Sequence, residues 1–307
     1  MDRVTTFSSY SAVTSALMQA ENSEAVAQTQ ISTGKLATDL KGYGANAEAL
    51  TATKTLKART DSFIDNNNAA ASKLSAQDLA LGQVSDAATG ARQAIANAVA
   101  SGRADGLMES LQSYFTQAAS GLNSQYNGHY LFAGGKVDTA PVGAQTLSDL
   151  TTMAPTQIFQ NDQLAETTRL DQSTTLQTGM LADGVGTGLF NAFAAVQTYQ
   201  QGAGGPFSGT LTAAQTTFLT GMLQTFDTAS TGVTAAAASN GLNQNRVDDA
   251  LTSNKDRQSM LEGMVGDMTN VDIAKSSSLL SQSQLALQAS AQVFSGLQTY
   301  SLLNFLK

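Results

Sequence analysis

The chain has 307 residues, enough for one large domain or two smaller ones, and only 13% of them are charged. Its formal net charge of -8 and its lack of a basic patch argue against nucleic-acid binding, because nothing would neutralise the phosphates. Without cysteine it forms no disulfide. No apolar run approaches the roughly 18 residues of a membrane span, so we expect no membrane insertion. The N-terminus also lacks the continuous apolar segment of an ordinary secretory signal.

A heptad-like stripe predicts the first helix. Residues recur every three or four positions from residue 10 to residue 31, which is typical of a helix that packs along another helix. The stripe consists of Tyr10, Val13, Leu17, Ala20, Glu24, Ala27 and Ile31. Gly34 supplies a plausible stop for this helix.

A second long helix is predicted from about residue 46 to residue 100, where the same spacing runs from Ala70 to Ala98. At 1.5 Å per residue such a helix would be roughly 80 Å long, so we expect an elongated molecule. Residues 101–106 break it, and Asp105 is expected to cap the helix that follows over 107–122.

The turn signal Asn127-Gly128 then introduces a predicted strand over 129–132. Residues 136–186 lose helical periodicity, and we expect a small β-rich insertion with strands at 156–160 and 166–178. Helix returns over 187–201, breaks before Pro206 and resumes near residue 209.

The next stripe, between residues 242 and 268, contains the polar residues Asn254 and Gln258. These two side chains, like Glu24 in the first stripe, either fix the helix register or lie at the wet edge of the stripe, and we expect the latter. A new helix start is indicated at residues 270–272, with Asp272 in its first turn.

The last helix carries two adjacent seven-residue stripes, and a face this wide suits a helix that contacts more than one neighbour. One stripe is Ile273, Leu280, Leu287 and Phe294, and the other is Leu279, Ala286, Val293 and Tyr300. The predicted assembly interface consists of Tyr10, Val13, Leu17, Ala20, Ala27, Ile31, Ile273, Leu279, Leu280, Leu287, Val293, Phe294, Leu297 and Tyr300.

The last helix is not expected to be stable by itself. Burial of its large apolar residues would gain roughly 10–20 kcal/mol in sum, whereas ordering its backbone costs roughly 1–2 kcal/mol per residue. The first helix offers a partner of similar length and periodicity. If the two pair, their outer apolar positions stay exposed, which indicates assembly with other chains. We hypothesise that the terminal helices are poorly ordered in the free monomer and lock in a polymer.

The predicted fold is therefore mainly α with a small β-rich insertion, in which both termini build an elongated coiled-coil or helix-bundle rod around a β-containing middle domain. The predicted domains are an N-terminal coiled-coil helix and loop (1–45), the N-terminal half of the rod (46–135), a variable β-rich domain with a short helix (136–206), the C-terminal half of the rod (207–268) and a C-terminal coiled-coil helix (269–307).

Short motifs in both flanks resemble those of the flagellin superfamily. Residues 31–36 (ISTGKL) resemble the S-T-G-K/R box that follows the first helix of flagellins and their relatives. Residues 240–247 (NGLNQNRV) are similar to the segment around Q-N-R, and residues 271–274 (VDIA) and 300–306 (YSLLNFL) to the last helix. Residues 127–135 (NGHYLFAGG) resemble the N-G-x-Y-L-F-A/S-G segment of hook–filament junction proteins, the third of the hook-associated proteins. The loop after Gly34 lacks the family's D-D-P cluster, so contacts of that loop are not transferred.

The resemblance implies a structural component of the bacterial flagellum, an adapter that joins hook to filament, whose terminal coiled coils line a tube while the middle lies outside. It also implies self-association, contacts with the hook, neighbouring hook-associated proteins and flagellin, and export through the flagellar type III channel without a cleaved signal. An export chaperone would bind the C-terminal region. The alternative within the family is a filament flagellin.

No residue set indicates catalysis, a cofactor or a metal. His129 is the only histidine and has no acidic cluster near it in sequence, and Gly134-Gly135-Lys136 lacks the spacing of a phosphate-binding loop. Asp39 and the pair Asp248-Asp249 lack the spacing of a calcium loop. A helical signalling module would need an anchor or partner motif, and an enzyme would need convergent polar groups; the sequence indicates neither.

Overall fold

The computed structural model describes the backbone of residues 2–305 and the side chains of residues 8–296. Its helices are α1 (Asp2–Thr33), η1 (Lys41–Asn46), α2 (Ala47–Ser101), α3 (Leu107–Leu122), α4 (Asp149–Thr152), α5 (Pro155–Ile158), α6 (Ala182–Gln201), α7 (Ala213–Thr269) and α8 (Ile273–Phe305). Its strands are β1 (Gln125–Tyr126), β2 (His129–Tyr130), β3 (Thr167–Arg169) and β4 (Thr175–Gln177). The predicted class is confirmed: long helices at both ends enclose two small antiparallel sheets, β1-β2 and β3-β4.

Residue contacts divide the chain into two units, which we describe separately. Unit 1 comprises the residues up to Arg59 and those from Arg257 onward, and unit 2 comprises Thr60–Asp256. Among the described residues, no helix is long and apolar enough to cross a membrane.

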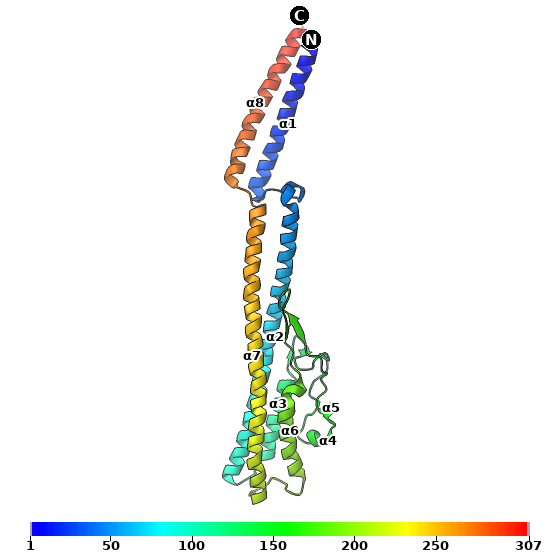
Figure 1. The fold of residues 1–307 in the computed structure, drawn as a ribbon, viewed down its shortest axis with the longest axis vertical. Coiled ribbons are helices and arrows are strands. Elements are labelled where there is room, and N and C mark those ends of the chain that lie inside the picture. The colour runs from blue at the N-terminus through cyan, green and yellow to red at the C-terminus, as the bar shows by residue number, and fades with distance from the viewer. Residues whose placement is uncertain (1, 306–307) are drawn as a thin grey trace. The chain divides into compact units, whose positions relative to one another are not determined.

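In unit 1, α1 and α8 pack side by side in opposite directions, with both chain ends at the same end of the pair (Figure 1). Gly34 ends α1 as predicted, because its φ of 66° is in the left-handed region that favours glycine. Its amide donates back to the carbonyl of Gln30 at 2.9 Å.

The residues after Gly34 bind the α7–α8 connection, within the same unit. The amide of Leu36 donates to the carbonyl of Thr269 at 2.8 Å, and the amide of Val271 donates to that of Gly34 at 3.0 Å. The Lys35 Nζ atom donates to Asn270 Oδ1 at 2.6 Å. The box that follows α1 therefore fixes where α8 begins.

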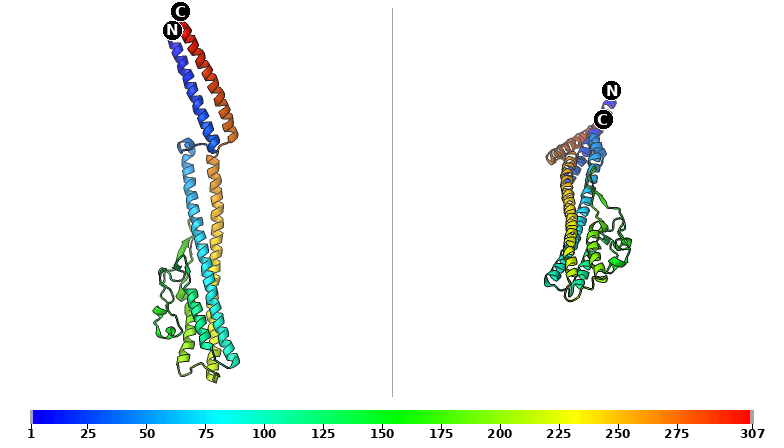
Figure 2. Two further views of the ribbon diagram at one scale, coloured as in Figure 1. Left: turned by 180° about the vertical axis from the view of Figure 1, so that it is seen from behind. Right: turned by 60° about the horizontal axis from the view of Figure 1, so that its bottom comes forward.

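Unit 2 is a helical bundle, in which α3 and α6 lie beside the adjoining parts of α2 and α7 (Figures 1 and 2). Its core consists mainly of aliphatic side chains, and phenylalanine rings connect three of its helices. The ring of Phe115 meets those of Phe190 and Phe193 edge to face, at centroid distances of 5.1 and 5.7 Å. Phe193 in turn meets Phe226 at 5.1 Å. These contacts join α3, α6 and α7.

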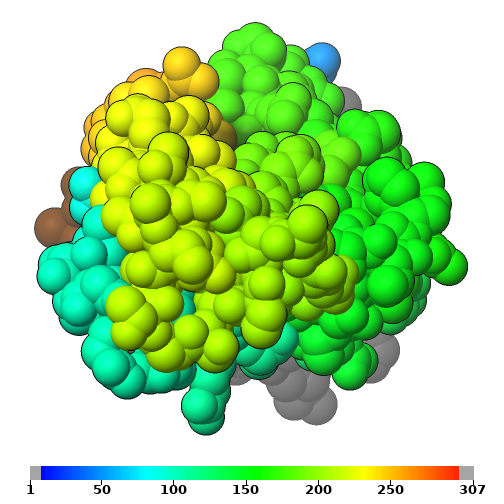
Figure 3. Space-filling view, turned by 90° about the horizontal axis from the view of Figure 1, so that it is seen from below, coloured from blue at the N-terminus to red at the C-terminus, as the bar shows by residue number. Residues whose placement is uncertain are grey.

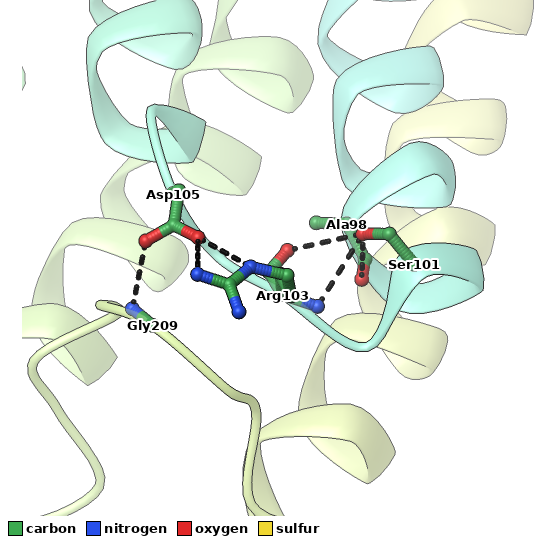
Figure 4. Close-up of polar contacts among 5 residues, drawn as sticks. All are labelled: Ala98, Ser101, Arg103, Asp105 and Gly209. Atoms are coloured by element: carbon green, nitrogen blue, oxygen red, sulfur yellow. Dashed lines mark hydrogen bonds and ion pairs between the residues drawn. The ribbon is translucent and has the colours of Figure 1, made fainter.

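At one end of unit 2, which Figure 3 shows from below, the α2–α3 turn pairs with the segment between α6 and α7 through a bridge of Arg103 with Thr210. The expectation that Asp105 caps α3 was wrong. The N-cap is Gly106, in a left-handed conformation. Instead Asp105 Oδ1 accepts from the Gly209 amide at 3.1 Å, and its Oδ2 accepts from Arg103 Nε at 2.7 Å (Figure 4). The carboxylate binds another segment rather than its own helix.

The β1-β2 hairpin turns at Asn127 and Gly128, whose φ angles are 52° and 82°. Both values are positive, as a two-residue type I′ loop requires. The expected strand over 129–132 is shorter than predicted, because β2 ends at Tyr130. Leu131 and Phe132 follow it into the core.

The β3-β4 hairpin agrees with the strands predicted within 166–178, but other expectations for the middle were wrong. Residues 156–160 form no strand, because Pro155 starts the short helix α5, a position that suits its fixed φ. Within this stretch, Phe159 forms an isolated antiparallel bridge with Val142. Helix α6 begins at Ala182 rather than 187, and α7 begins at Ala213 rather than near 209.

The same hairpin rests on two buried asparagines. Asn67 of α2 and Asn254 of α7 both donate their side-chain amides to the carbonyl of Leu170, at 3.1 and 3.0 Å. Asn254 is 2% exposed, so the expectation that it lies at a wet edge was wrong. A buried amide in a helix stripe is stable here because the hairpin carbonyl satisfies it.

Candidate assembly surface

The predicted interface residues of α1 all lie on the face that packs against α8. Ala20 and Ala27 are buried, at 6% and 0% exposure, and the others are half-buried. On α8, Leu280, Leu287 and Phe294 are half-buried and alternate with Ser276, Ser283 and Ser290. This alternation puts a small residue between large ones every three or four positions, the pattern of a coiled-coil seam.

Three contacts fix how the two helices pair. The rings of Tyr10 and Phe294 meet edge to face, with centroids 5.5 Å apart. At the other end, Ser276 Oγ donates to Gln30 Oε1 at 2.9 Å. Between them, Gln284 Nε2 donates to Glu24 Oε1 at 3.4 Å. The one acidic member of the α1 stripe is thus satisfied across the pair.

The remaining predicted residues of α8 lie outside the buried seam with α1 and are exposed. Ile273, Leu279 and Val293 are 47%, 37% and 53% exposed. We define the outer stripe as these three residues together with Leu285, Met18 and Val26, which are exposed by 68%, 57% and 49%. The predicted residues Leu297 and Tyr300 lie outside the described side chains.

Sequence reasoning missed Met18, Val26 and Leu285. Met18 and Val26 each stand one position from a seam residue, so the seven-residue pattern assigned them to no stripe. The sequence feature that could have identified Met18 and Val26 is an apolar residue directly beside a seam position.

The outer stripe has no charged neighbours over most of its length. The sequence contains no Asp, Glu, Lys or Arg between Val4 and Ala20, or between Ser276 and Leu306. The solvent face of a surface helix normally carries such residues. A helix pair that lacks charged residues over most of its length is suited to contact with other protein.

Two hollows flank Leu279 on this helix pair. One, of about 430 Å³, is lined by Met18 and Val26 of α1 as well as by Leu279. The other, of about 620 Å³, lies at the start of α8, where Leu36 and Val271 join Leu279. An apolar side chain from another molecule would therefore meet a concave, largely uncharged surface on either side of Leu279.

The magnitudes indicate weak individual contacts. Each outer-stripe side chain is partly exposed, so its complete burial would gain roughly 1 kcal/mol. Six such gains sum to roughly 6 kcal/mol. This sum lies at the low end of the estimated 4–15 kcal/mol that association costs in lost translational and rotational freedom. Stable association through this surface therefore requires several neighbours at once.

The described residues offer no site for metal chemistry: nowhere among them do three or more His, Asp or Glu side chains gather. His129 Nδ1 lies 3.2 Å from Asp138 Oδ1 on an exposed surface. Gly134 and Gly135 form a turn, and Lys136 Nζ donates to the Gln160 carbonyl at 3.0 Å.

Residues 4–137 match the model of the bacterial flagellin N-terminal helical region, and residues 223–306 match that of the flagellin C-terminal helical region. The chain belongs to the flagellin family. It is thus a flagellar structural protein, of a family whose members are not enzymes. A comparison with curated protein sequences finds no match.

Solved structures share the flagellin-type fold. One, described as a flagellar hook-associated protein from Vibrio parahaemolyticus, is similar with a TM-score of 0.62 at 17% identity, over 73% of this chain and 97% of that one. Another, FlgL from Bacillus cereus, is similar with a TM-score of 0.56 at 13% identity, over 70% of this chain and 99% of that one. The matched helical regions contain α1 and the described part of α8, which form the pair described above.

Proposed function

We propose that this protein is an adapter that joins the flagellar hook to the filament, and that it assembles through the α1–α8 pair. The observation that carries the proposal is the outer stripe. Exposed apolar residues such as Leu285 and Val293 lie on helices with no charged residue nearby in sequence. Neighbouring copies in a ring or tube would cover them and so stabilise both helices.

The junction role is supported by residues 127–135. Their sequence resembles that of hook–filament junction proteins, and their aromatic and aliphatic side chains have a structural task here. Leu131 and Phe132 are 4% and 0% exposed and anchor the β1-β2 hairpin in the unit 2 core. The names of the two similar structures, a flagellar hook-associated protein and FlgL, also support a hook-associated role.

The partners follow from this role. The adapter would contact the hook and neighbouring hook-associated proteins on one side and flagellin on the other. It would reach the cell exterior through the flagellar type III channel without a cleaved signal peptide, and an export chaperone would hold its C-terminal region beforehand. No catalytic step is part of this mechanism.

The test places charge on the outer stripe. The double substitution Leu285→Glu and Val293→Glu introduces two carboxylates at exposed positions, so that the monomer should fold while assembly fails. The matched control is Leu79→Glu, on α2 of unit 2, where the side chain is 78% exposed. Motility and filament attachment should be lost in the double variant and kept in the control. Normal filaments in the double variant, with its folding verified by circular dichroism, would refute the mechanism.

The alternative is a filament flagellin, and location distinguishes the two. A junction adapter occurs as a narrow band at the distal end of the hook, whereas a flagellin labels the filament along its length. Immunogold labelling of isolated flagella decides between these roles, and it does so independently of the charge variants.

A further inference from the structure

The chain contains two Asn-Gly dipeptides, Asn127-Gly128 and Asn240-Gly241. Glycine after asparagine permits a specific reaction, because no side chain keeps the glycine nitrogen away from the asparagine side-chain amide. The structure puts the two dipeptides in opposite environments, and the difference allows an inference about one of them.

Asn127-Gly128 forms the tip of the β1-β2 hairpin, and both residues are exposed. The strands on either side are only two residues long. Among the hydrogen bonds of the described residues, none involves the Asn127 side chain or the Gly128 amide. The side chain is therefore free to move, and water reaches it.

Asn240-Gly241 lies inside α7. Asn240 is 0% exposed, and its side-chain amide donates to the carbonyl of Leu74 at 2.8 Å. The helix also holds the backbone of the next residue, Gly241, in place. Both reacting groups are held, and the packing excludes water.

We propose that Asn127 is a site of spontaneous deamidation in the folded protein, and that Asn240 is not. The backbone nitrogen of Gly128 attacks Cγ of Asn127, loses its proton and forms a new C–N bond, while the C–N bond of the side-chain amide breaks and ammonia leaves. The resulting five-membered succinimide takes up one water molecule. Opening at one carbonyl gives aspartate, and opening at the other gives isoaspartate.

The turn must open before it reacts. The backbone of a type I′ loop is held by its flanking pairs, whereas the attack requires rotation about the bonds of Asn127. A two-stranded hairpin with two residue pairs opens locally at low free energy. The reaction in the folded protein is therefore slower than in an unfolded chain but not abolished.

The products alter the hairpin. Both add a negative charge at a turn whose neighbours His129 and Asp138 are paired at 3.2 Å. Isoaspartate also adds a methylene group to the backbone of a two-residue loop, whose length sets the pairing of β1 with β2. Modified molecules should therefore have a looser hairpin.

The experiment incubates the purified full-length protein at mildly alkaline pH, once in buffer and once in concentrated urea. Peptide mass spectrometry and isoaspartate assay measure conversion at both asparagines. In urea both sites should react at similar rates. In buffer the rate at Asn240 should be at least about 100-fold lower than at Asn127, because α7 must unfold globally before Asn240 can cyclise.

The urea sample is the internal control, since it shows that both dipeptides are chemically competent. If Asn127 in buffer stays as unmodified as Asn240, or if Asn240 reacts as fast as Asn127, the proposal is wrong. The substitution Asn127→Ser should remove the fast conversion in buffer and leave that of Asn240 in urea unchanged.

Discussion

The ring of Tyr10 packs edge to face against the ring of Phe294, with their centroids 5.5 Å apart. The two residues are near opposite ends of the chain, and their contact sets the register of α1 against α8. The hydrogen bond of Ser276 with Gln30 keeps the same antiparallel register at the other end of the seam. Edge-to-face pairs of this kind contribute about 0.5–1.5 kcal/mol beyond their buried area.

Phe294→Ala should therefore weaken the α1–α8 pair. A fully buried phenylalanine costs about 3–5 kcal/mol when truncated to alanine, and this half-exposed one should cost about 1–2 kcal/mol. Amide hydrogen exchange in the seam should accelerate by roughly tenfold, since about 1.4 kcal/mol corresponds to that factor.

The matched control is Val293→Ala, one residue away, where the side chain is 53% exposed and faces outward. It should leave exchange in the seam almost unchanged. Equal acceleration in both variants would mean that the seam is not the stabilising contact of α8.

The sequence predicted the long helices well and the middle of the chain poorly, for physical reasons. Proline-free flanks with apolar residues every three or four positions indicate helices, and α2 over 47–101 agrees closely with the expected 46–100. The start of α7 was missed although a signal existed. Thr212 and Gln215 bond reciprocally, at 3.2 and 3.0 Å, as a capping box.

Other features depend on partners that are distant in sequence. Asn254 is buried because a carbonyl 84 positions away accepts its amide, and Asp105 binds Gly209 104 positions away. Local pattern does not reveal such contacts. The predicted interface positions divided into a seam and an exposed side only when the α1–α8 pairing was known. The role of these positions in assembly and the boundaries of the five predicted domains stay predictions.

Because Asn67 and Asn254 donate to the same carbonyl of Leu170, we expect their substitutions to have non-additive effects on the free energy of unfolding. Among the described residues, the side chains that donate to this oxygen are Asn67 and Asn254. Each single substitution to alanine leaves one donor and should lower the free energy of unfolding by about 1 kcal/mol. The double substitution leaves a buried carbonyl unsatisfied and should cost more than the sum.

Urea unfolding of the wild type, both single variants and the double variant measures this coupling. Asn245→Ala is the control, because Asn245 is exposed on the same helix and should have almost no effect. Strict additivity of the two substitutions would show that the asparagines act independently of the Leu170 carbonyl.

Substitution of two glycines of unit 2 by alanine should change the stability of the protein in opposite directions. A Cβ atom on Gly121 of α3 would lie 2.8 Å from Val84 Cγ2 and 3.1 Å from the carbonyl oxygen of Ala80. Gly121→Ala should therefore push α3 from α2 and destabilise the protein by about 1–3 kcal/mol. A Cβ on Gly82 would meet nothing within 4 Å.

Gly82→Ala should stabilise the protein by up to about 1 kcal/mol, because alanine is the better helix former. Thermal unfolding measures both variants in one assay. A gain in stability for Gly121→Ala would contradict the close approach of α2 and α3 at this point.

Acid should weaken the β3-β4 hairpin through Asp171. Hydrogen bonds from the Ser173 amide, and further ones from Thr174 and the Ser173 hydroxyl, lower the pKa of Asp171 from 3.8 to about 2. A lowered pKa in the folded state means that the ionised form is stabilised by folding. This contribution is complete above about pH 4 and is lost as the pH falls through about 2. NMR titration of the Asp171 carboxyl group should give a midpoint near 2.

Asp171→Asn isolates this effect from other titrating groups. The amide accepts the same hydrogen bonds more weakly and does not ionise, so the variant should be less stable than the wild type at pH 5. As the pH falls from 4 to 2 the wild type should lose this advantage, and the two free energies of unfolding should converge. A difference between the two proteins that stays constant over this range, in urea unfolding at fixed ionic strength, would show that the turn does not hold the carboxylate in its charged form.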